Sequence, residues 1–78
     1  MDLDIELRNY LAAAEEHFLS VEAGNHRRAN AAYDRAENAF RNLSAAGSQG
    51  RELLLAALTH PSMRVRSWVA SHLLMYSS

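Results

Sequence analysis

The sequence contains no cysteine and no long apolar run. Without cysteine, neither a disulfide framework nor a thiolate metal site can stabilise the fold, and secretion gains no support from redox chemistry. No apolar stretch approaches the length of a membrane span, and the acidic, mixed amino terminus lacks the basic and apolar regions of a signal peptide. We therefore predict an untargeted protein of the reducing cytoplasm with no membrane partner.

A large charge of one sign is also missing, because the net charge of the 78 residues is only −1. Residues 1–24 carry six acids and one arginine, residues 25–46 four arginines and two acids, and residues 47–78 three arginines and one acid, which gives −5, +2 and +2. Nucleic-acid affinity rests mainly on neutralising phosphates. Scattered arginines in two segments of +2 do not make a basic stripe, so we predict no nucleic-acid partner.

The few glycines and the single proline divide the chain into four segments of helical character. Glycine favours helix ends, and the residue before a proline is pushed out of the α region. The expected helices run from about Asp4 to Ala23, from the Asn25 cap to Ala46, along the apolar run from Leu53 to near Thr59, and from the Ser62 cap to Tyr76. Residues 44–50 are expected to form a loop. The predicted fold is a single all-α domain, residues 1–78, with two stacked antiparallel αα-hairpins, about 3–46 and 48–77.

Apolar residues that recur at helical spacing predict the core. The first segment places Leu3, Leu7, Tyr10, Leu11, Ala14, Phe18 and Val21 on one face, and the second places Ala29, Ala32, Tyr33, Ala36, Ala39, Phe40 and Leu43 on its inner face. The ten larger residues expected in the core are Leu7, Leu11, Phe18, Tyr33, Phe40, Leu54, Leu58, Val65, Val69 and Leu73. A domain of 78 residues buries only about 60% of the surface of its unfolded chain, so a partner or a self-contact would add useful stability.

The sequence contains no recognisable catalytic or metal-binding pattern. The four histidines have no partner at i,i+4 among themselves, no HExxH pattern or glycine-rich phosphate loop occurs, and no serine, threonine or lysine has the spacing of an activated nucleophile. We expect the His60 ring to bond to backbone at the corner before Pro61. The sequence thus predicts a protein that is not an enzyme and holds no metal or cofactor.

The stretch LTHPSMRVRSW permits a different interpretation as a helix-turn-helix. Two helices joined by a short turn would place Arg64, Arg66 and Ser67 early in the second helix, where a recognition helix carries its base contacts. The acidic first segment, the proline in the turn and the largely apolar fourth segment disfavour DNA binding. This interpretation stays the minor alternative.

Two motifs resemble known helical repeats. VRSWVASHLL, preceded by HPS, resembles the second helix of a HEAT repeat. EAGNHRRANAAYDRAENAFRNL, with its pairs Gly24-Asn25, Ala29-Asn30 and Tyr33-Asp34, is similar to the central segment of a small HEAT-like bacterial family catalogued as a domain of unknown function. The resemblance covers about residues 14–74 and implies a HEAT- or armadillo-like scaffold for protein contacts.

Small members of that family resemble immunity proteins of bacterial toxin systems. The resemblance therefore implies a cytoplasmic bacterial immunity protein that binds a toxin domain and neutralises it, with a generic HEAT-like adaptor or regulatory module as the alternative. A toxin-domain reading frame immediately upstream would favour immunity over the adaptor.

Two residues besides Pro61 are predicted to be structural. Arg66 lies beside Val69 and Leu73 at the margin of the apolar face of the fourth segment. A long arginine stem at that position should be buried, and its guanidinium should pair with a carboxylate. Asp34 is the first expected partner and Glu37 the second.

The fourth segment is predicted to carry the partner-binding surface. It is apolar over about 220° of its circumference at 100° per residue, more than one hairpin can cover. Members of the similar family usually continue with further helices, so Trp68, His72 and Met75, with Arg64 nearby, are expected to be exposed or to be covered by a partner or a second copy. Equally, Trp68 could pack against the third segment. A second candidate surface is the acidic side of the first segment, with Glu6, Glu15, Glu16 and Glu22, which suits a basic toxin cleft.

Overall fold

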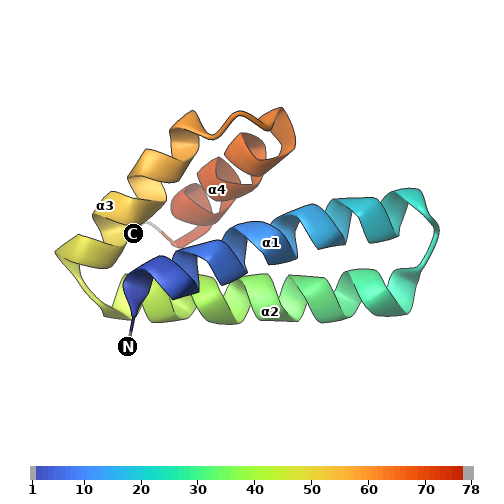
Figure 1. The fold of residues 1–78 in the computed structure, drawn as a ribbon, viewed down its shortest axis with the longest axis horizontal. Helices are drawn as coiled ribbons and strands as arrows, with labels where there is room; N and C mark the ends of the chain where they lie inside the picture. The colour runs from blue at the N-terminus through green and yellow to red at the C-terminus, as the bar shows by residue number, and fades with distance from the viewer. Residues whose placement is uncertain (1, 77–78) are drawn as a thin grey trace.

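The computed structural model describes residues 2–76, and within that range the fold is all α-helical, as predicted. The four helices are α1 (Leu3–Glu22), α2 (His26–Ala45), α3 (Ser48–Ala56) and α4 (Met63–Tyr76), and a short 3₁₀ helix, η1 (Ala57–Thr59), continues α3. α1 and α2 lie antiparallel along the long axis of the molecule, and α3 and α4 lie over one side of this first hairpin (Figure 1).

Capping side chains fix the starts of the first two helices. The Asp2 carboxylate accepts hydrogen bonds from the N–H groups of Asp4 and Ile5, so α1 begins at Leu3, slightly earlier than expected. Asn25 accepts from the Arg28 N–H and caps α2, as predicted. Between these helices Gly24 adopts a φ of +73°, a conformation that a side chain disfavours.

The predicted loop at residues 44–50 is wrong. α2 continues to Ala45, and α3 begins at Ser48, because Gly47 with its φ of +76° is sufficient to reverse the chain. Gly50 is therefore in the first turn of α3 and is buried against α2. A Cβ atom at Gly50 would collide with the backbone carbonyl of Leu43, so the two helices can approach this closely only without a side chain there.

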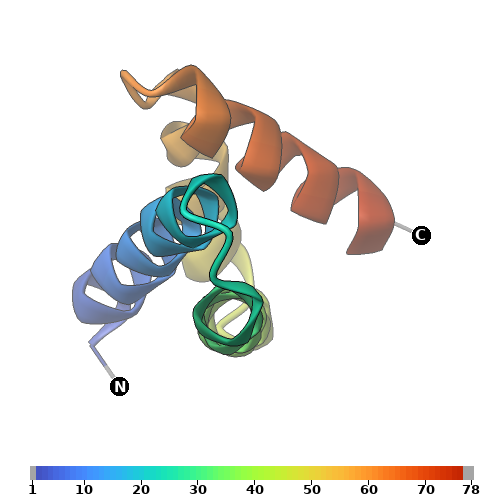
Figure 2. The ribbon, with the colours of Figure 1, turned by 90° about the vertical axis from the view of Figure 1, so that its right-hand side faces the viewer.

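α4 does not pack along the whole of α3. Its main contacts are with η1 and α1, and Figure 2 shows it passing over the first hairpin. α3 instead packs mainly on α2 and makes fewer contacts with α1. The second hairpin is thus open, and α1 supplies the surface on which α4 rests.

The core lies where these helices meet. Its buried apolar residues are Tyr10, Ala13, Ala14, Ala29, Ala32, Ala36, Ala39, Phe40, Leu43, Leu54, Ala57, Val65 and Val69. Of the ten larger core residues predicted, Phe40, Leu54, Val65 and Val69 are buried, and the other six are half-buried. Val21 is exposed, contrary to prediction, because the end of the first hairpin near Gly24 projects beyond the second hairpin (Figure 1).

The corner between η1 and α4 uses Arg66, but not with the predicted carboxylates. The Arg66 Nη1 donates to the carbonyl oxygens of His60 (2.7 Å) and Pro61 (3.1 Å). Asp34 is exposed on α2, and Glu37 accepts from Arg41 at 3.2 Å. Arg66 does not pair with Asp34 or Glu37 because the carbonyls of the turn lie closer to its guanidinium than either carboxylate does. These carbonyls belong to residues five and six positions earlier in the chain.

Two shorter-range contacts complete the corner. His60 Nδ1 accepts a hydrogen bond from the Ser62 N–H at 3.0 Å, which confirms the predicted contact between this ring and the backbone. The Ser62 hydroxyl accepts from the Val65 N–H at 3.4 Å, so Ser62 caps α4 as expected. The chain therefore turns sharply at His60-Pro61, and the Ser62 N–H and the His60 and Pro61 carbonyls all have side-chain hydrogen-bond partners.

Arg66→Ala is expected to lower the free energy of unfolding by about 1–2 kcal/mol, because two carbonyls lose a charged donor in a partly solvated position. Urea denaturation monitored by circular dichroism measures the loss. Asp34→Ala is the matched control and should change stability by less than about 0.5 kcal/mol. Equal losses in the two variants would reinstate the predicted pairing of Arg66 with Asp34.

Candidate interaction surfaces

Trp68 is the centre of an aromatic cluster that joins α4 to the first hairpin. Its ring centroid lies 5.6 Å from that of Phe18 and 5.7 Å from that of Tyr33, at interplanar angles of 75° and 72°. The His17 ring is 4.8 Å away, and its Nδ1–H donates to the Ala29 carbonyl at 3.0 Å. Trp68 is therefore half-buried against α1 and α2, neither fully exposed nor packed on the third helix as the two sequence-based alternatives proposed.

His72 is a core residue, which corrects its predicted exposure to a partner. It is only 3% exposed. A 2.7 Å hydrogen bond joins its Nδ1 to the Tyr10 hydroxyl, and its ring is stacked on Phe40 at 4.9 Å. His72 lies seven residues after Val65 and three after Val69, which places it on the same inward face of α4. The sequence pattern instead favoured its assignment to the apolar surface that one hairpin was not expected to cover.

Burial changes the acid–base properties of this pair. It lowers the pKa of His72, and the nearby Glu37 carboxylate opposes that effect only in part. It also raises the pKa of Tyr10, which the neighbouring Trp68 indole slightly opposes. These two shifts leave both Tyr10 and His72 neutral near pH 7. In the same region, the Trp68 Nε1–H is shielded from solvent but has no hydrogen-bond partner of proper geometry among residues 2–76.

A shallow apolar groove of about 200 Å³ lies beside this cluster. Its lining residues are Phe18, Tyr33, Ser67, Trp68, Ser71, His72 and Met75. Met75 stands at the groove and is 64% exposed, and the adjacent Leu74 is 76% exposed. Of the residues predicted to bind a partner, Trp68 and Met75 thus share one surface, called the α4 groove below.

Arg64 makes intramolecular contacts at the start of α4. It forms an ion pair with Glu22, in the last turn of α1, and its guanidinium carbon lies 5.9 Å from the centroid of the Phe18 ring. The Arg64 and Glu22 side chains are each about half exposed, so the ion pair itself contributes little stability. Arg64 therefore borders the α4 groove without being an unpaired cation there.

Two acids of the predicted acidic surface of α1, Glu16 and Glu22, are paired with arginines. The Glu16 carboxylate accepts from Arg28 Nε at 2.9 Å and from Arg35, and these hydrogen bonds lower the pKa of Glu16. Glu6 accepts from Asn42 at 3.3 Å. Sequence periodicity placed the acids on one flank of α1 but could not show that arginines of α2 would lie opposite them.

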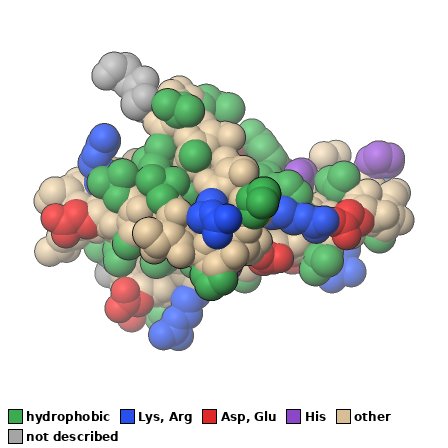
Figure 3. Space-filling model, turned by 90° about the horizontal axis from the view of Figure 1, so that it is seen from above, with side chains coloured by type: hydrophobic (Ala, Val, Ile, Leu, Met, Phe, Trp, Pro, Cys, Tyr) green, Lys and Arg blue, Asp and Glu red, His purple; other side chains and the backbone are tan. Residues whose placement is uncertain are grey.

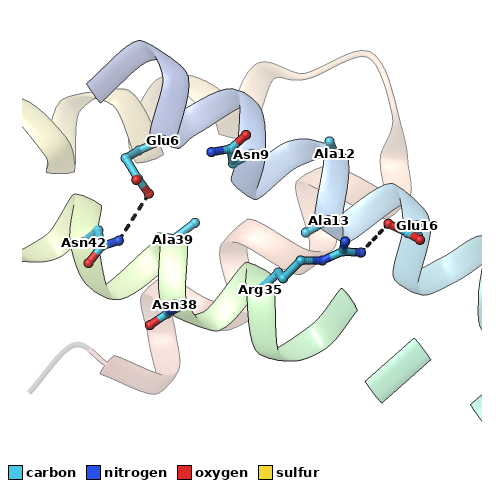
Figure 4. A pocket seen from close by; sticks show the side chains of 9 residues that line it. All are labelled: Glu6, Asn9, Ala12, Ala13, Glu16, Arg35, Asn38, Ala39 and Asn42. Atoms are coloured by element: carbon cyan, nitrogen blue, oxygen red, sulfur yellow. Dashed lines mark hydrogen bonds and ion pairs between the residues drawn. The ribbon is translucent and has the colours of Figure 1, made fainter. Parts of the chain in front are cut away.

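These contacts border a polar groove of about 440 Å³ between α1 and α2. Figure 4 shows Arg35 reaching across to Glu16 and Asn42 reaching across to Glu6, with Ala12, Ala13 and Ala39 between them. The alanines let the helices approach closely, and the polar pairs bridge the two sides. The groove walls carry two acids, Glu6 and Glu16, and one arginine, Arg35.

The described residues contain no group of three or more histidines, aspartates or glutamates that could hold a metal ion. Acidic and basic side chains are interspersed over the face shown in Figure 3, without a field of one sign. None of the helices in residues 2–76 has the length and apolar character needed to cross a membrane.

Comparisons of the chain with protein-family models, with curated proteins and with solved structures found no match. The resemblance to HEAT-like proteins therefore depends on the two sequence motifs alone.

Proposed function

We propose that this chain is a non-enzymatic protein–protein interaction module that binds its partner at the α4 groove. The observation that supports this most is the exposure of Met75 beside aromatic groove walls, and the neighbouring residue in the helix, Leu74, is exposed as well. Aromatic residues and methionine are enriched at protein interfaces, and hot spots cluster in pockets that exclude water. The polar hydroxyls of Ser67 and Ser71 provide a hydrogen-bonding rim.

The size of the groove favours a protein partner over a small molecule. Pockets for drug-sized ligands and cofactors usually have about 300–1,000 Å³ and enclose most of the ligand. The α4 groove has about 200 Å³ and is open to solvent. Its chemistry suits one apolar side chain that projects from a protein surface, with the exposed end of α4 contacting the surrounding residues.

The partner that we propose is a toxin domain, which would make this chain a cytoplasmic bacterial immunity protein with a HEAT-like fold. Support for this step comes from the motif resemblance at residues 14–74. A generic HEAT-like adaptor is the alternative, and the gene immediately upstream distinguishes the two. The helix-turn-helix alternative has less support, because Arg64 is paired with Glu22 and Arg66 with backbone carbonyls.

Met75→Arg is expected to weaken binding of the toxin encoded upstream by about 30-fold or more, the effect of losing a hot spot of about 2 kcal/mol. Isothermal titration calorimetry with the purified toxin domain measures it. Because Met75 is exposed, the melting temperature should stay unchanged. Sedimentation equilibrium of the free protein tests whether the same surface mediates self-association.

Glu15→Lys is the matched control for the acidic side of α1. It should leave binding intact if the α4 groove is the site. Loss of binding in Glu15→Lys together with normal binding in Met75→Arg would place the partner on the acidic side instead. Normal binding in both variants would eliminate both surfaces.

A further inference from the structure

The His72 ring is the buried polar junction between α4 and both helices of the first hairpin. Its Nδ1 is hydrogen-bonded to Tyr10 of α1 at 2.7 Å, and its face is stacked on Phe40 of α2 at an interplanar angle of 27°. Because the three residues belong to three different helices, α4 cannot leave the hairpin without breaking both contacts. His72 also forms part of the lining of the α4 groove, so the junction supports the proposed partner site from inside the fold.

The surroundings of His72 suit a neutral imidazole better than a charged one. Tyr10 faces it from α1, Trp68 lies next to it on α4 at 5.2 Å between ring centroids, and Glu37 is the acid that acts on it from α2. Arg41 is 3.2 Å from the Glu37 carboxylate and competes for that charge. An imidazolium ion at His72 would therefore be buried among aromatic rings, and Glu37, the carboxylate that acts on it, is already paired with Arg41.

The helix that would respond to this charge is α4. It is attached through the His60-Pro61 corner and rests on α1 and η1. α1 and α2, in contrast, are extensively packed on each other and are bridged by polar contacts such as Glu16 with Arg28. Local opening occurs most readily in the parts of a fold that have the fewest buried contacts. Release of α4 is thus easier than separation of α1 from α2.

We propose that His72 is a proton-sensitive latch: uptake of one proton from solvent by its imidazole releases α4 from the first hairpin, while α1 and α2 stay paired. In the released state the imidazolium is hydrated and needs no buried counter-ion. Release also separates Trp68 and Met75 from Phe18 and Tyr33, so it dismantles the α4 groove.

The direction of the pH dependence follows from the lowered pKa of docked His72 relative to its ordinary value of 6.5. Above about pH 6.5 neither state takes up the proton, so the release equilibrium does not change with pH. Below that value the released state is protonated and the docked state is not, so the equilibrium constant for release rises by up to about tenfold per pH unit. The rise ends once the pH falls below the pKa of docked His72.

Amide hydrogen exchange followed by NMR tests the latch. From about pH 7.5 to about pH 5.5, protection factors of α4 amides should fall by up to about tenfold, the limit set by one proton, while those of α1 and α2 hold. His72→Gln should abolish this selective fall. His26→Gln, at the exposed start of α2, is the matched control and should retain it.

Three results would overturn the latch: no fall in α4, an equal fall in all helices, or a selective fall that persists in His72→Gln. Where His72→Gln does not fold, the imidazole resonances of the wild-type protein decide the question. Titration of docked His72 below pH 6.5, together with the selective fall, supports the proposal. Titration at or above 6.5 contradicts it.

Discussion

Gly50→Ala is expected to lower the free energy of unfolding by about 3 kcal/mol, the upper part of the range for overpacking. The added methyl group would meet the Leu43 carbonyl, which belongs to the backbone of α2 and cannot rotate aside. α3 would have to move away from α2, and Leu54, buried one turn later on α3, would lose packing with it. Urea denaturation of the purified variant measures the change.

Gly24→Ala is the matched control, because it adds the same methyl group at a glycine with open space around it. Its cost comes only from the left-handed φ of +73° and should be about 1 kcal/mol. A smaller loss at Gly50 than at Gly24 would show that α3 can shift without penalty and that the close contact with Leu43 is unimportant.

Phe40→Ala should have the largest effect of any single truncation in the core, a loss of about 3–5 kcal/mol. Phe40 is 2% exposed and its ring is in contact with those of Tyr10 and His72, so it supports all three long helices at once. A domain of this size has about 5 kcal/mol of stability, so the variant keeps at most about 2 kcal/mol, and its melting temperature by circular dichroism should fall by more than about 10 °C.

Leu74→Ala is the control for this truncation. It also truncates a large apolar side chain, although a smaller one than phenylalanine, at a position that is 76% exposed, and the expected change is below about 0.5 kcal/mol. A folded Phe40→Ala protein with an unchanged melting temperature would mean that the inward face of α2 has been assigned incorrectly.

The candidate surface was only partly predictable. The sequence identified α4 as the helix with excess apolar surface, and Met75 is exposed on it. It also selected His72 and Arg64 for partner binding, yet His72 is buried against Tyr10, and Arg64 is paired with Glu22. Tyr10 and His72 are separated by 62 positions, so no local pattern could indicate that they meet.

The sequence by itself determined the four helices and most of their ends, because these depend on neighbours within one or two turns, but it placed the start of α3 near Leu53 instead of at Ser48. Gly24 and Gly47 can adopt positive φ values, Asn25 and Ser62 can cap, and Pro61 cannot continue a helix. It also determined the inner face of α2, since alanines and Phe40 recur at helical spacing.

Only the tertiary structure decided which neighbouring helix each helix face contacts, and in which register along the helix axis. A helical period gives the direction of a side chain but neither the neighbour nor the register, because these depend on how four helices pack together at once. That packing placed Arg66 on the carbonyls of the corner, Gly50 against Leu43, and the arginines of α2 opposite Glu16. It buried His72 for the same reason: α4 rests on α1, where Tyr10 supplies the hydrogen bond that a buried imidazole needs.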